Sequence, residues 1–127
     1  MVESQLGPGY FSLGGSVDEW VRDTVVAMAV DQGVGAFAAQ ATALATRPDA
    51  WFLLKGIAVP TLIACGAGDR ICLPETHRRM AALLPIATFR SIRAAGHLSP
   101  LEQPEAVTRV LRAWLDDAAQ NSTPSRQ

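Results

Sequence analysis

The sequence lacks the features that mark several large classes of protein. It has no run of basic residues and its formal net charge is −1, which argues against a nucleic-acid-binding surface. Its apolar stretches are all shorter than the ~18 residues that a membrane-spanning helix needs. Its N-terminal stretch, MVESQLGPGY, does not have the basic-then-apolar pattern of a secretory signal. We therefore expect a soluble, cytoplasmic protein with no nucleic-acid or membrane partner.

Cysteine is also scarce. The two cysteines, Cys65 and Cys72, are spaced C-x6-C, and a structural disulfide is not expected in a chain without an export signal. Cys65 ends an apolar run and is expected to be a small buried hydrophobe. A zinc site that adds His77 and His97 matches no structural zinc spacing. The sequence therefore predicts no metal and no other cofactor. A small metal- or redox-linked protein built on Cys65 and Cys72 is a third alternative, weaker than the two functions below.

Residues 1–56 have the pattern of helices and connections. The capping box SVDE, with Ser16 as the capping residue, opens a helix over 16–31. Gly33 then interrupts the pattern, and a second, alanine-rich helix follows. A short helical turn is expected over 49–56. No strand is expected in this segment.

Residues 57–119 change in character and predict an α/β unit. The apolar run VPTLIAC is typical of a strand that is buried on both faces. The segment that opens with Pro74 and the later segment PEAVTRVLRAWLDD have the apolar spacing of helices. The remaining residues, 120–127, are expected to be disordered. The expected elements are a strand at 59–65, a helix at 74–85, a strand at 88–92 and a helix at 104–117.

This order of elements predicts an α/β fold with two parallel strands, flanking helices and an N-terminal helical segment. Two parallel strands do not make a stable sheet alone, because parallel strands are normally flanked by others and covered on both faces. At 127 residues the chain has the length of one domain or of a piece of a larger one. The unpaired strand edges predict either self-association or pairing with strands that the sequence does not supply.

Two polar side chains follow the two expected strands. Asp69 comes soon after the first strand in GAGDRICLP, and His97 comes soon after the second in AAGHLSP. Because the carboxyl ends of neighbouring parallel strands lie about 4.8 Å apart at one edge of a sheet, the two side chains are expected to meet. A carboxylate on one nitrogen of an imidazole fixes its tautomer and leaves the other nitrogen free to act as a base. The pattern predicts a catalytic acid–base pair.

The stretch from IAVPTLIACGAGDRICLPETHRRMAALLP through AAGHLSPLEQPEAVTRVLRAWL resembles the C-terminal third of an α/β-hydrolase. The helical stretch FAAQATALATRPDAWFLL resembles the cap segment that precedes the acid-bearing strand in esterase-like members. The resemblance implies the fold of that family and hydrolysis of an ester or similar acyl substrate. The matching residues are Pro60, Thr61, Leu62, Gly66, Asp69, Pro74, Gly96, His97, Glu102 and Pro104.

Carried over residue by residue, the resemblance implies that Asp69 is the acid of a catalytic triad and that His97 is its general base. It gives Glu102 and Pro104 structural roles at the last helix, whose N-terminal dipole favours a carboxylate nearby. It makes residues 1–56 a cap-like segment.

The nucleophile of such a triad has no counterpart in the sequence. The family places a serine in G-x-S-x-G on a strand-to-helix turn. Ser16 in LGGSVD comes nearest, but it lacks the second glycine and no strand precedes it. The type of nucleophile, Ser, Cys or Asp, stays open. The serines of the chain are Ser4, Ser12, Ser16, Ser91, Ser99, Ser122 and Ser125.

Two functions follow as expectations. The first is a C-terminal portion of a serine-type hydrolase, which is inactive until another part supplies the nucleophile and then acts on a small acyl substrate. The second is a non-catalytic, truncated hydrolase scaffold that binds a partner through its open sheet edge. Trp51 and Phe52 are candidates for a wall of the substrate pocket, although packing between cap and core also explains them. His77 lies beside two arginines and is expected on a solvated helix face.

Overall fold

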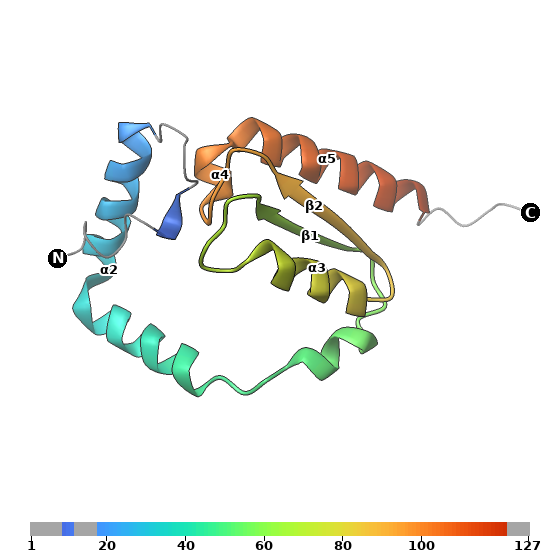
Figure 1. Cartoon of the computed structure of the whole chain (residues 1–127), viewed down its shortest axis with the longest axis horizontal. Coiled ribbons are helices and arrows are strands. Elements are labelled where there is room, and N and C mark those ends of the chain that lie inside the picture. The colour runs from blue at the N-terminus through green and yellow to red at the C-terminus, as the bar shows by residue number, and fades with distance from the viewer. Residues whose placement is uncertain (1–8, 12–17, 122–127) are drawn as a thin grey trace, which may run out of the picture.

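The computed structural model describes residues 9–11 and 18–121 of the chain. A helical arm lies along one side of a small α/β unit, and the chain passes from the arm into the unit through a 3-10 turn (Figure 1). The elements are helix α2 (Glu19–Thr46), 3-10 helix η1 (Trp51–Gly56), strand β1 (Thr61–Gly66), helix α3 (Pro74–Leu83), strand β2 (Ala87–Ile92), helix α4 (Ser99–Glu102) and helix α5 (Pro104–Asn121).

The two strands form a parallel pair, as the order of elements predicts. Thr61 lies opposite Ala87, and the register continues to Gly66, which lies opposite Ile92. Helix α3 packs against both strands and α5 packs against β2, so the two helices lie on opposite sides of the strand pair (Figure 1). Both strands therefore end at the same edge of the unit. The observed architecture confirms the predicted partial α/β fold.

The core of the described structure is small. Its buried apolar residues include Val21, Cys65, Leu84 and Ile92, and the burial of Cys65 confirms the sequence prediction. The expectation that β1 is buried along both faces is wrong, because only Cys65 and Gly66 of that strand are buried. Helix α3 covers one side of β1, and β2 is its sole neighbouring strand among the described residues, so the rest of β1 stays partly exposed.

A large apolar surface remains exposed. The accessible area is 9382 Å², roughly 1.4 times the ~6,500 Å² that a compact monomer of 13.5 kDa exposes. Part of this area is contributed by large side chains on α2, among them Val34, Phe37 and Leu44, whose exposed fractions are 86%, 66% and 68%. Leu111 and Leu115 on α5 are also exposed, at 45% and 55%. Many large apolar side chains of the described structure are thus left uncovered.

Helix α2 consists of two limbs that meet at a bend at Gly33, where φ is 70° and ψ is 166°. A φ in this region favours glycine, so Gly33 allows the change of direction that the sequence pattern predicts. The expected capping residue, Ser16, lies outside the described residues, and Asp18 occupies the N-cap position. No helix within the described ranges is long and apolar enough to cross a bilayer.

The C-terminal half differs from expectation in two places. Helix α5 continues to Asn121, so the expected disordered tail begins too early, and residues 122–127 lie outside the described ranges. Helix α4 was not expected. It is a single turn that begins at Ser99 with Pro100 in its first positions. The proposed division of the chain between residues 56 and 57 stays a prediction, although η1 ends at Gly56.

Candidate functional site

The loops that follow β1 and β2 are joined to each other through their backbones. The Ala67 N–H donates to the Ile92 carbonyl at 2.8 Å, and the Gly68 N–H donates to the Ala95 carbonyl at 2.9 Å. These bonds continue the ladder of the parallel strands into the loops. The loop that carries Asp69 therefore has a fixed position relative to the loop that carries His97.

Gly66 allows the two loops to approach this closely. A Cβ atom built on Gly66 would overlap the carbonyl oxygens of Ala95 and Gly96, which belong to the backbone and cannot move aside cheaply. Only glycine fits at such a close approach of two backbones. The glycine that ends β1 is thus a geometric requirement of the site.

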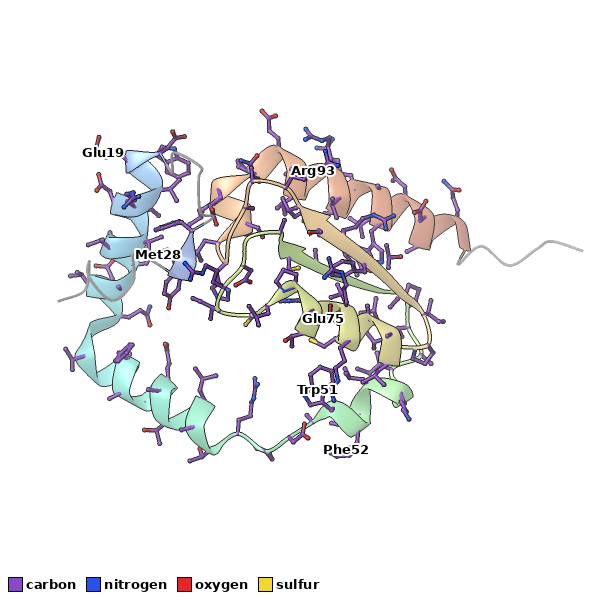
Figure 2. The ribbon with its side chains drawn as sticks, in the orientation of Figure 1. Glu19, Met28, Trp51, Phe52, Glu75 and Arg93 are labelled. Carbon is purple, nitrogen blue, oxygen red and sulfur yellow. The ribbon has the colours of Figure 1, made fainter. Side chains whose placement is uncertain are left out.

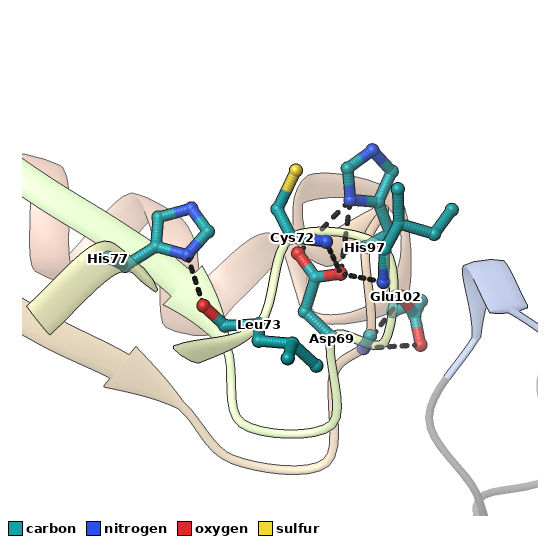
Figure 3. Close-up of polar contacts among 8 residues, drawn as sticks. Asp69, Cys72, Leu73, His77, His97 and Glu102 are labelled. Carbon is teal, nitrogen blue, oxygen red and sulfur yellow. Dashed lines mark hydrogen bonds and ion pairs between the residues drawn. The ribbon is translucent and has the colours of Figure 1, made fainter. Parts of the chain in front are cut away.

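Asp69 and His97 lie in direct contact (Figure 3). Nδ1 of His97 lies 3.0 Å from Oδ2 and 3.2 Å from Oδ1 of Asp69. The Asp69 side chain is 4% exposed, whereas the His97 side chain is 30% exposed. With Asp69 ionised, Nδ1 carries the proton and donates it, and Nε2 points away from the carboxylate (Figure 3). The structure brings the two predicted residues together, and their catalytic roles stay a prediction.

The carboxylate of Asp69 is also held by its own loop. Its Oδ1 accepts the N–H groups of Ile71 and Cys72, each at 2.9 Å. Burial acts to raise the pKa of Asp69. The hydrogen bonds from Cys72, His97 and Ile71 outweigh burial, and the pKa of this carboxyl lies below its ordinary value of 3.8. Asp69 is thus a carboxylate at neutral pH, which is the state that can orient an imidazole.

The loop that carries His97 is anchored from its C-terminal side by residues at the end of α4. Both carboxylate oxygens of Glu102 lie 2.9 Å from the backbone N of Gly96 (Figure 3). Nε2 of Gln103 donates to the Ala94 carbonyl at 3.3 Å. Ala94 has a φ of 53°, in the region that favours glycine, so the loop turns sharply here. The structural role that the resemblance implies for Glu102 thus has a specific partner, the Gly96 amide.

A residue that the sequence analysis missed contacts His97 from the other side. The backbone N–H of His97 donates to the carbonyl of Tyr10 at 2.8 Å. The Tyr10 and His97 rings meet at 80° with their centroids 5.6 Å apart. No periodicity or motif surrounds Tyr10, and the contact joins segments far apart in the chain. No signal in the sequence could have identified it.

The other candidate residues lie apart from this contact network. Trp51 is covered by the guanidinium of Arg79, 4.6 Å from its ring centroid, which fits packing between η1 and α3. Phe52 is 75% exposed, and both aromatic side chains extend from η1 (Figure 2). Their role in a substrate pocket stays a prediction. Nδ1 of His77 lies 3.2 Å from the Leu73 carbonyl at the start of α3.

Both cysteines are free thiols. Cys65 is buried, and this burial, followed by the charge of Asp69, raises the pKa of its thiol. Cys72 is exposed in the Asp69 loop. Within residues 9–11 and 18–121, no three His, Cys, Asp or Glu side chains gather in a way that could hold a metal ion.

The chain is similar to a known protein family and to several solved structures. Residues 2–110 match the sequence model of a family described as the alpha/beta hydrolase family. A thermophilic esterase from Thermogutta terrifontis, solved with malate bound, is 44% identical, with a TM-score of 0.56 over 58% of this chain. No curated protein matches the chain.

Two more distant structures share the fold. A serine hydrolase involved in carbazole degradation is 24% identical, with a TM-score of 0.51 over 54% of this chain. A membrane phospholipase A, described as a bacterial virulence factor, is 20% identical, with a TM-score of 0.73 over 91% of this chain. The chain covers 27% of the esterase, 26% of the carbazole-degradation hydrolase and 37% of the phospholipase. It therefore spans well under half the length of each of these three proteins.

Proposed function

The chain belongs to the alpha/beta hydrolase family, and from this premise we propose that it supplies the acid and the general base of a serine-type hydrolase that acts on carboxylic esters. One observation carries the proposal. The buried carboxylate of Asp69 lies 3.0 Å from Nδ1 of His97, while the other ring nitrogen points away from it. The similarity to the thermophilic esterase supports an ester as the substrate class.

In this proposal His97 moves protons and Asp69 keeps its ring in one state. Nε2 of His97 accepts the hydroxyl proton of the nucleophile as its oxygen attacks the ester carbonyl. The imidazolium then gives that proton to the departing alcohol. In the second half of the reaction, Nε2 takes a proton from water as the water oxygen attacks the acyl-enzyme. The imidazolium then returns this proton to the nucleophile oxygen as the acyl bond breaks, which releases the acid and restores the hydroxyl. Asp69 accepts from Nδ1–H throughout and stabilises the imidazolium.

The nucleophile must come from another polypeptide segment. Among the described residues the serines are Ser91 in β2 and Ser99 at the start of α4, and neither lies in a G-x-S-x-G turn. Removing a triad member from a serine hydrolase costs a factor of roughly 10⁶ in kcat. We therefore expect the 127-residue chain alone to show no measurable ester hydrolysis.

The edge of β1 that faces away from β2 is suited to pair with a strand of the nucleophile-bearing part. The sequence of β1, TLIACG, has no charged residue, as is typical of a strand paired on both sides. In contrast, β2 carries Arg90, and a charged side chain on an edge strand opposes further pairing. We propose that a strand from the nucleophile-bearing part pairs with β1.

A fusion enzyme tests the proposal. The part of the thermophilic esterase that precedes the segment matched by this chain is joined through a flexible linker to the full 127-residue chain. We expect this fusion to hydrolyse p-nitrophenyl acetate. His97→Ala should reduce kcat by a factor of roughly 10⁶, and Asp69→Asn by about 10⁴.

His77→Ala is the matched control, because His77 is the other histidine of the chain and its ring lies against the Leu73 carbonyl at the N-terminus of α3. It should leave the hydrolysis rate unchanged. A folded fusion that hydrolyses the ester equally well with and without His97 would remove that residue from the mechanism. A folded fusion without activity would contradict the assignment of the chain as the acid- and base-bearing part.

The exposed apolar surface favours one other function, a non-catalytic scaffold that binds a partner through the β1 edge. This alternative predicts that the fusion folds, that the β1 edge pairs, and that no ester hydrolysis appears. The hydrolysis measurement therefore separates the two functions.

A further inference from the structure

We propose that Tyr10 is a positioning residue for His97, and that its ring restricts the rotation of the imidazole so that Nε2 faces the nucleophile. The proposal rests on the proposed function of His97 as general base. It concerns a residue outside the segment that carries the acid and the base, and it assigns a role to the short stretch 9–11.

Tyr10 contacts His97 in two independent ways. Its backbone carbonyl accepts the His97 N–H at 2.8 Å, which fixes the backbone of the histidine. Its ring meets the His97 ring nearly edge to face, at 80° with 5.6 Å between centroids. This is the preferred geometry of an aromatic pair, in which the positive edge of one ring faces the negative face of the other. Tyr10 therefore constrains both the backbone and the side chain of His97.

The stretch 9–11 is itself anchored to both halves of the molecule. Phe11 is buried, with 8% of its surface exposed, and the guanidinium of Arg22 on α2 lies 5.6 Å from its ring centroid. On the other side, a Cβ atom on Gly9 would lie in van der Waals contact with Ile71, in the loop that carries Asp69. Tyr10 thus has a buried neighbour, Phe11, and its position does not depend on His97 alone.

The bond to Asp69 does not hold the imidazole completely. Nδ1 lies within 3.2 Å of both carboxylate oxygens, so the ring can tilt between them without losing its partner. The His97 side chain is still 30% exposed, which leaves room for such a movement. The Tyr10 ring, at right angles to the imidazole, blocks it on one side. Asp69 therefore selects the proton position while the imidazole faces it, and the Tyr10 ring keeps the imidazole from turning away from Asp69.

The first test measures the ring nitrogens of His97 by ¹⁵N NMR in the 127-residue chain. The two ¹⁵N shifts distinguish the protonated nitrogen from the unprotonated one. We expect Tyr10→Phe, which keeps the ring, to retain the wild-type pattern with the proton on Nδ1. Tyr10→Leu and Tyr10→Met lack a ring, and we expect the two shifts to move toward each other as the tautomers begin to exchange.

The amide of His97 provides the check that the segment stays in place. Its hydrogen bond goes to the Tyr10 carbonyl, which every variant retains, so its exchange protection should persist. Two ringless variants are used because their side chains differ in shape. A variant that keeps the exchange protection of the His97 amide has its backbone in place, and its ring-nitrogen shifts then test the proposal. Wild-type ring-nitrogen shifts in the ringless variants would overturn the proposal.

The second test measures kcat and KM of the fusion enzyme with p-nitrophenyl acetate. We expect Tyr10→Leu to lower kcat roughly threefold to tenfold with KM unchanged, and Tyr10→Phe to restore it. Phe37→Leu is the matched control, because Phe37 is an aromatic residue of α2 that is 66% exposed. An equal kcat in Tyr10→Leu and wild type would overturn the proposal. An inactive wild-type fusion would count against the proposed function, and the NMR result would still decide the role of Tyr10.

Discussion

Replacing Asp69 with asparagine separates the structural role of this residue from its chemical role. The carboxylate accepts two backbone N–H groups through Oδ1 and faces Nδ1 of His97. An asparagine of the same shape can keep its oxygen on the two N–H groups, and its NH₂ group then faces Nδ1. Because Nδ1 must now accept a hydrogen bond, the proton moves to Nε2. The histidine is left in the tautomer that cannot accept a proton from a nucleophile.

The expected cost in stability is modest. The substitution replaces charge-assisted hydrogen bonds by neutral ones, which are about half as strong, and we expect the free energy of unfolding to fall by about 1–2 kcal/mol. Asp69→Ala provides the contrast. It leaves the N–H groups of Ile71 and Cys72 without their acceptor, and we expect a loss of about 2–4 kcal/mol. The expected loss of activity is the same for both, about 10⁴-fold in kcat of the fusion enzyme.

The stability difference should also depend on pH in a defined direction. The pKa of Asp69 is lower in the folded chain than its ordinary value of 3.8, because the hydrogen bonds that it accepts outweigh its burial. The ionised carboxylate therefore stabilises the folded chain above pH 3.8, and this contribution is lost as the pH falls through the folded-state value. The part of the gap between wild type and Asp69→Asn that the Asp69 charge supplies should therefore close as the pH falls below 3.8.

Urea denaturation followed by tryptophan fluorescence measures these differences, since the chain has three tryptophans. The ¹⁵N shifts of His97 report the tautomer in the same samples. If Asp69→Asn kept both the wild-type tautomer and the wild-type kcat, the argument that Asp69 orients the base would fail. A stability gap that stayed open as the pH fell well below 3.8 would contradict the direction of the pKa shift.

Three further substitutions test the loops around the pair by the same denaturation assay. Gly66→Ala places a methyl group on the backbone carbonyl of Gly96, and we expect the free energy of unfolding to fall by about 3 kcal/mol or more. A variant as stable as wild type would refute the close approach of the two loops. Ala94→Gly removes a strained φ of 53°. We expect the free energy of unfolding to rise by up to about 1 kcal/mol, because the entropy that glycine loses on folding offsets part of the relieved strain. A lower urea midpoint than wild type would contradict this expectation. Glu102→Ala removes the acceptor of the Gly96 amide, and we expect a loss of about 1–3 kcal/mol, whereas Glu105→Ala, at a side chain 91% exposed, should change little.

The α/β unit could be predicted from the sequence because its signals are local. Pro74 marks the start of α3 through its own backbone preference, and the apolar run that ends at Cys65 marks β1. The bend of α2 could be predicted for the same reason, because Gly33 adopts a φ that other residues avoid. The exposure of β1 could not, because an apolar strand has the same sequence whether or not its neighbouring strands are present.

The pairing of Asp69 with His97 could be predicted from topology alone. Parallel strands deliver their following loops to one edge, and the two residues follow neighbouring strands. The supports of the pair could not be predicted in the same way. The bond between Glu102 and the Gly96 amide depends on the single-turn helix α4, whose short sequence SPLE has no periodicity to detect. The contact of Tyr10 depends on the fold of the whole chain.

The bonds that hold Asp69 and His97 in place all come from residues of this chain. Asp69 is held by its own loop and by His97, and the His97 loop is held by Glu102 and Tyr10. None of these bonds requires the nucleophile or the strand that would carry it. Asp69 and His97 are therefore held in contact by this chain alone. Under the proposed function, the second part would have to place the nucleophile and the oxyanion-hole donors against a pair that is already oriented. For this reason the tautomer of His97 can be measured in the chain alone, and a histidine without a fixed tautomer there would show that the second part orders the site.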